Sequence, residues 1–179
     1  MAFSNTQIEI TSLPTVSSID YKGLDKDYLI ATLIRKLFTW IIIGVVASVV
    51  VQINKSNSDF KEIAGPYINY VIIGLCIIAL LNFLFAYLGF FKKGYAVREK
   101  DISYKTGLFW KSKTLIPFNR IQHSEVKQGP FERLFGLSSL RVYTAGGSAS
   151  DLSIYGLKQA EANHLKQFII AKTSADEEE

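Results

Sequence analysis

Two long stretches without a charged side chain constrain this chain more than any other feature. They cover residues 37–53 and residues 67–91, which are 17 and 25 residues long. A helix rises ~1.5 Å per residue, so the second stretch exceeds the ~30 Å hydrocarbon core of a bilayer. The first reaches across once the preceding residues add a helical turn. A buried helical hairpin would share this composition, but two runs of such length predict an integral membrane protein.

Basic residues beside the two spans predict their orientation. Eight of them flank the pair: Lys22, Lys26, Arg35 and Lys36 before the first span, and Lys92, Lys93, Arg98 and Lys100 after the second. The linker 54–66 contains only two basic residues, Lys55 and Lys61. Because basic flanks stay in the cytoplasm, we expect both termini to be cytoplasmic in a multi-pass protein of the plasma membrane.

Three residues within the spans are candidates for helix packing. Gly44 and Ser48 lie four apart, a small-xxx-small spacing that allows two helices to approach closely. Asn82 lies deep in the second span and should make a hydrogen bond between helices rather than face lipid. Two spans without a buried acid or base make a poor pump or channel.

The pattern changes from helix to strand after Lys93. Apolar alternation and turn residues predict strands over 95–98, 102–105, 108–116, 121–127, 140–144 and 152–155. Gly129-Pro130 opens a helical turn over 131–135, and an amphipathic helix begins at Leu157. Phe135 and Leu137 flank Gly136, and we expect both to be buried. The predicted fold is two transmembrane α-helices plus a mainly antiparallel β domain, a barrel or sandwich with a C-terminal α-helix.

These patterns divide the chain into six segments. They are a disordered N-terminal tail (1–24), an amphipathic lead-in at the membrane surface with the first transmembrane helix (25–53), an external loop (54–66), the second transmembrane helix (67–91), the β domain (92–172) and an acidic tail (173–179).

Charge is unevenly distributed along the chain. Residues 92–175 hold 14 basic and six acidic side chains, a net +8. A basic domain beside a membrane suggests anionic lipid, although general solubility would also account for it. The candidate lipid-facing residues are Lys92, Lys93, Trp110, Lys111 and Lys113. Lys111 and Lys113 lie two apart on one predicted strand and would therefore share a face.

The residues of this chain do not form a recognisable catalytic or metal-binding set. One cysteine, Cys76, and two separated histidines, His123 and His164, are too few for a zinc site. Neither a phosphate-binding loop nor a nucleophile motif is present in the sequence. We therefore expect no enzyme activity and no cofactor, and the membrane tether argues against a nucleic-acid partner.

Several motifs of the β domain are shared with a known family. They are IPFNRIQ (116–122), QGPFERLFGL (128–137), LRVYTAGG (140–147) and Gly156-Leu157. With the two spans, they make residues 25–170 resemble the bacterial PH-like domain of the YdbS/YdbT type, once catalogued as a domain of unknown function. The resemblance implies two packed antiparallel sheets capped by a C-terminal helix, in a membrane-associated binding or scaffold module without enzymatic activity.

Two functions fit these features. The leading expectation is a scaffold or adaptor whose PH-like domain binds a partner protein at the membrane surface, with a second PH-like membrane protein as one candidate partner. The alternative is direct recognition of anionic membrane lipid by the basic domain.

Overall fold

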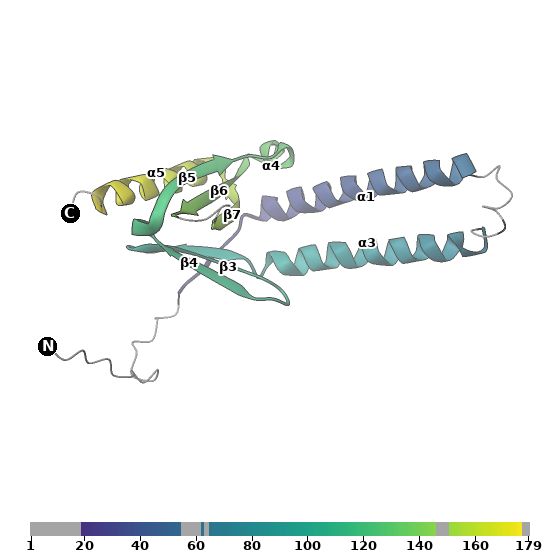
Figure 1. Cartoon of the computed structure of the whole chain (residues 1–179), viewed down its shortest axis with the longest axis horizontal. Coiled ribbons are helices and arrows are strands. Elements are labelled where there is room, and N and C mark those ends of the chain that lie inside the picture. The colour runs from purple at the N-terminus through teal and green to yellow at the C-terminus, as the bar shows by residue number, and fades with distance from the viewer. Residues whose placement is uncertain (1–18, 55–61, 63–64, 146–150, 177–179) are drawn as a thin grey trace, which may run out of the picture.

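The structure is a computed structural model that describes residues 19–54, 62, 65–145 and 151–176. Two helices, α1 (Lys26–Asn54) and α3 (Ile68–Phe90), extend side by side from one end of a small domain (Figure 1). A short 3-10 turn, η2 (Gly65–Tyr67), leads into α3. Both helices are long and apolar enough to cross a membrane, and their apolar segments are not buried within the protein. The predicted pair of transmembrane helices is confirmed.

The domain consists of two open antiparallel sheets and a C-terminal helix, so its strands form a sandwich rather than a closed barrel. The first sheet has the order β1-β2-β3-β4 and the second the order β5-β6-β7. The strands are β1 (Lys22–Gly23), β2 (Gly94–Val97), β3 (Asp101–Thr106), β4 (Ser112–Pro117), β5 (Ile121–Lys127), β6 (Leu137–Thr144) and β7 (Leu152–Lys158). The helical elements are η3 (Phe118–Arg120), α4 (Pro130–Leu134) and α5 (Gln159–Asp176).

A single apolar core lies between the two sheets and α5. Alternating side chains of the strands point into it, as a half-buried strand requires. Its fully buried members include Ile102, Leu140 and Ile154 from the sheets. The Phe118 ring packs edge-on against Phe168 of α5, with ring centroids 5.7 Å apart. The helix therefore closes the open side of the sandwich, as predicted.

The turn at Gly136 is buried less completely than predicted. Leu137 is fully buried at the start of β6, whereas Phe135 is only partly buried against the core. The reason is local: Phe135 is the C-cap of the short helix α4 and lies between the exposed residues Leu134 and Gly136. The expectation of two buried side chains is correct for Leu137 and wrong for Phe135.

The segment before α1 is tied to the domain, where the sequence predicted a tail. Lys22–Gly23 pair with β2 as strand β1, and the Lys22 ammonium lies 2.5 Å from a Glu161 carboxylate oxygen. The first turns of α1 bury Tyr28 and Ala31 in the domain core. The predicted lead-in is continuous with the spanning helix, and its first turns pack on the domain. Its position at a membrane surface stays a prediction.

The fourth strand is shorter than predicted. It begins at Ser112, because Gly107 makes a tight turn with a φ of 113°. A Cβ on Gly107 would lie 1.7 Å from the Trp110 carbonyl oxygen, so only glycine fits there. Residues 108–111 consequently form a loop. The predicted shared strand face for Lys111 and Lys113 is wrong, because Lys111 precedes the strand. The Gly146-Gly147 pair lies outside the described residues.

Candidate functional site

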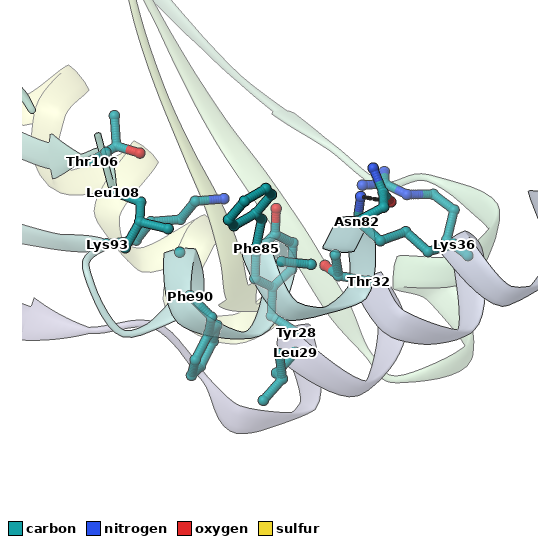
Figure 2. A pocket seen from close by; sticks show the side chains of 14 residues that line it. Tyr28, Leu29, Thr32, Lys36, Asn82, Phe85, Phe90, Lys93, Thr106 and Leu108 are labelled. Carbon is teal, nitrogen blue, oxygen red and sulfur yellow. Dashed lines mark hydrogen bonds between the residues drawn. The ribbon is translucent and has the colours of Figure 1, made fainter. Parts of the chain in front are cut away.

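The most informative cavity lies where the two spanning helices join the domain. It has a volume of about 380 Å³, within the range of small-ligand pockets. The residues that line it come from the start of α1, the end of α3 and the β3–β4 loop: Tyr28, Leu29, Thr32, Arg35, Lys36, Asn82, Phe85, Ala86, Gly89, Phe90, Lys93, Thr106, Gly107 and Leu108. We call it the junction pocket (Figure 2).

Three cationic side chains converge on the junction pocket. They are Arg35 and Lys36 of α1 and Lys93, which follows α3, and the described lining contains no carboxylate. The Lys36 ammonium donates a 2.6 Å hydrogen bond to the Asn82 side-chain oxygen across the two helices (Figure 2). The Lys93 ammonium lies 5.6 Å from the centre of the Tyr28 ring, a cation–π distance. These contacts hold Lys36 and Lys93 in place without neutralising their charges.

The electrostatic cost of this arrangement is visible at Lys93. Burial lowers the pKa of the Lys93 ammonium from its ordinary value of 10.5, and the positive charges of Arg35 and Lys36 lower that pKa further. Desolvation and like charges both disfavour the charged form of a lysine. An anion in the pocket would counteract the repulsion from Arg35 and Lys36 and would offset the cost of burying the Lys93 charge.

A buried hydroxyl also lies beside the cations. The Thr32 hydroxyl makes no hydrogen bond of good geometry to the described residues, and the polar group near it is the Tyr28 phenol. It therefore retains the capacity to donate a hydrogen bond to a ligand. Guanidinium and ammonium groups together with a hydroxyl are suitable donors for the oxygens of a phosphate group.

The position of the pocket along α1 indicates its depth relative to the membrane-spanning segment. Arg35 and Lys36 are the last charged residues before the uncharged stretch 37–53. On α3, Asn82 lies eight residues before the helix ends at Phe90. The pocket therefore lies at the depth where the charged part of the chain meets its membrane-spanning part.

Only one predicted lipid-facing residue, Lys93, lines the junction pocket. Lys92 is exposed beside it in the turn after α3, and Trp110, Lys111 and Lys113 are exposed along the β3–β4 loop and β4. The structure thus separates this set into a pocket residue and a surface group. Whether the surface group faces lipid stays a prediction.

The residues predicted for helix packing have distinct environments. Asn82 bonds to Lys36 of the other helix, which is the kind of interhelical contact expected. It lies level with the last charged residue of α1 rather than deep in the span. Gly44 and Ser48 line a groove between α1 and α3. A Cβ on Gly44 would meet no atom within 4 Å, so this helix pair does not itself require glycine there.

Sequence reasoning used Arg35 and Lys36 only as orientation signals and missed Tyr28 and Thr32. A usable signal was present, because Tyr28, Thr32 and Arg35 recur at helical spacing on one face of α1. What the pattern did not reveal was that Lys93 would meet this face.

Comparison with known proteins agrees with this architecture. No solved structure matches the chain significantly. The UPF0699 transmembrane protein YdbS of Bacillus subtilis (strain 168) is 31% identical over 85 residues. That match covers 46% of this chain and 52% of the relative, so the chain spans about half the length of the curated relative it matches. A family model described as "Bacterial PH domain" matches residues 30–173. With its two transmembrane helices and PH-like sandwich, the chain belongs to the bacterial PH domain family.

Proposed function

We propose that this protein binds an anionic phospholipid of the cytoplasmic leaflet, with the lipid phosphate in the junction pocket. One observation carries the proposal: three cations surround a cavity whose described lining has no carboxylate, at the depth where the membrane span begins. Basic pockets between transmembrane helices on the cytoplasmic side suit anionic head groups. We propose binding alone, without a chemical change in the lipid. The proposal places the protein in the plasma membrane with both termini in the cytoplasm.

The lining suits both ends of such a lipid. A phosphate among Arg35, Lys36 and Lys93 would relieve their mutual repulsion and accept a hydrogen bond from Thr32. Phe85 and other apolar side chains of the helices extend from the pocket along the exposed surface of the spans. An acyl chain can follow this surface while the head group remains among the cations.

A protein scaffold is the second candidate, and the edge of the first sheet favours it. Strand β4 pairs only with β3 among the described strands, and Leu115 on it is exposed. An exposed edge strand accepts an extended peptide through backbone hydrogen bonds. Such a partner would be a protein of the cytoplasm or a second PH-like membrane protein, and nucleic acid is not proposed.

The test measures lipid retention by the purified full-length protein. Native mass spectrometry from neutral detergent should show bound phosphatidylglycerol in preference to phosphatidylcholine. Each basic residue near an anionic surface contributes ~1 kcal/mol, so Lys93→Met should weaken phosphatidylglycerol binding about fivefold or more. Lys92→Met removes the same charge outside the pocket and should leave binding nearly unchanged. Equal retention of both lipids, or equal loss in both variants, would contradict the proposal and favour the scaffold.

A further inference from the structure

Two apolar tips project from the domain on the side of the spanning helices. One is the β3–β4 loop, where Phe109 is 70% and Trp110 is 89% exposed. The other is the short helix α4, where Leu134 is 77% exposed. Single exposed apolar residues are ordinary on a protein surface. These side chains are unusual because both tips lie beside membrane-spanning helices.

Aromatic contacts fix each tip against a different helix. The Phe109 ring packs edge-on against Phe85 of α3, with ring centroids 5.4 Å apart. The Phe131 ring of α4 packs edge-on against Phe38 of α1, with centroids 6.2 Å apart. Figure 1 shows α4 beside the beginning of α1 and the β3–β4 turn beside the end of α3. The two tips thus flank the helix pair.

Both tips reach the level where the last charged side chains lie. The Lys36–Asn82 hydrogen bond marks that level on the two helices. Phe38 is two residues deeper along α1, about 3 Å, and Phe85 is three residues toward the cytoplasmic end of α3, about 4.5 Å, at ~1.5 Å per residue. The tips therefore lie within roughly one helical turn of the boundary between head groups and acyl chains.

Each apolar tip has a basic neighbour. Exposed Lys111 follows Trp110, and exposed Arg133 precedes Leu134. An aromatic or leucine side chain at the acyl boundary beside a cation at phosphate level is the chemistry of interfacial anchors. Indole rings in particular are enriched at this depth.

We propose that the β3–β4 loop and α4 insert their apolar tips into the head group–acyl boundary of the bilayer, on opposite sides of the helix pair. Insertion buries Trp110 and Leu134, which folding leaves in solvent, and it fixes the orientation of the domain on the membrane. The partner is the bilayer interface itself, so insertion does not depend on an anionic lipid in the junction pocket.

Depth-dependent fluorescence quenching of the full-length protein tests this proposal. The chain has two tryptophans, and Trp40→Phe leaves Trp110 as the sole emitter. In phosphatidylcholine vesicles, Trp110 should emit at a blue-shifted wavelength, and lipids brominated near the head group should quench it more than lipids brominated near the chain end. Emission typical of water, quenched by soluble acrylamide and not by brominated lipid, would overturn insertion of this loop.

A second pair of variants covers α4 and supplies the control. On the Trp40→Phe, Trp110→Phe background, Leu134→Trp should show the same shallow quenching. Ala171→Trp places an exposed tryptophan near the far end of α5 and should respond only to acrylamide. Equal quenching of both positions would contradict the proposal, because it would indicate general adsorption of the domain. Since the vesicles are zwitterionic, a negative result here would not bear on anionic lipid binding.

Discussion

Gly156 of β7 lies directly against the Tyr28 ring of α1, so closely that a Cβ on Gly156 would come within 2.4 Å of Tyr28 Cγ. The glycine has a φ of 68°, and its carbonyl accepts a 3.3 Å hydrogen bond from the Asp25 amide. The first turn of the membrane helix is thereby packed onto the second sheet. The helix pair α1 and α3 is therefore joined to the domain by a tight tertiary contact as well as by the chain between α3 and β2.

Gly156→Ala should destabilise this junction. A left-handed conformation costs a non-glycine residue about 1–2 kcal/mol, and overpacking against Tyr28 adds about 1–3 kcal/mol. We expect a loss of about 2–5 kcal/mol in the free energy of unfolding, measured by denaturation of the purified protein in detergent.

Gly136→Ala is the matched control for this substitution. Gly136 has a similar φ of 62°, but a Cβ there would meet no atom within 4 Å. It should lose only the conformational part, about 1–2 kcal/mol. Equal losses in the two variants would mean that the contact with Tyr28 contributes nothing.

Lys93→Met should raise stability while it lowers lipid binding. The substitution removes a partly buried charge that Arg35 and Lys36 repel, so the melting temperature in neutral detergent should increase. Lys92→Met, at the exposed neighbouring position, should change neither quantity. A fall in melting temperature for Lys93→Met would show that its ammonium stabilises the empty pocket.

The same group gives a pH dependence of defined sign. The pKa of Lys93 is lower in the folded state than its ordinary 10.5, so between these two values the unfolded chain holds more protons. Stability of the lipid-free protein should therefore rise with pH across that interval. The rise should be smaller in Lys93→Met than in the parent protein, as thermal scans of both proteins at several pH values will test.

Leu137→Ala and Phe135→Ala should differ in their cost. Leu137 is fully buried in the core, and truncating such a leucine costs about 2–5 kcal/mol. Phe135 is only partly buried, so its truncation should cost less than the ~3–5 kcal/mol of a fully buried phenylalanine. Chemical denaturation of the two variants compares them directly, and a larger loss for Phe135→Ala would contradict this ranking.

The elements of the fold were predictable where local pattern determines them. Uncharged length identified α1 and α3, and alternation identified β3 and β6, because burial of one sheet face imposes a period of two on the sequence. Strand β1 escaped prediction because a two-residue strand has no period of its own. It forms by pairing with β2, a contact between segments far apart in the sequence.

The candidate site was less predictable than the fold. Arg35 and Lys93 are 58 positions apart in the chain, and their meeting depends on how α3 returns beside α1. Lys111 shows the converse error, because a single turn at Gly107 removed it from the strand to which alternation assigned it. Local patterns predict which face a residue occupies, whereas a pocket depends on which faces meet.

Tyr95 should make the protein sensitive to alkali. Burial raises the pKa of its phenol to about 12, and the hydrogen bond that it donates to Glu161, 2.5 Å long, raises it as well. Since the folded pKa exceeds the ordinary value of 10.0, the stabilisation is complete below pH 10 and is lost as pH rises to about 12. Melting temperatures over this range should fall less steeply in Tyr95→Phe than in the parent protein. Parallel curves would show that Tyr95 does not contribute.

The orientation of the spans can be tested with single cysteines. On a Cys76→Ser background, which removes the one natural cysteine, Ser58→Cys lies in the linker and Ser174→Cys lies in α5. Because basic flanks stay in the cytoplasm, a membrane-impermeant maleimide should label only Ser58→Cys in intact cells. Ser174→Cys should react after the cells are permeabilised. The reverse pattern would place the junction pocket at the outer leaflet, where the proposed recognition of cytoplasmic-leaflet lipid would be excluded.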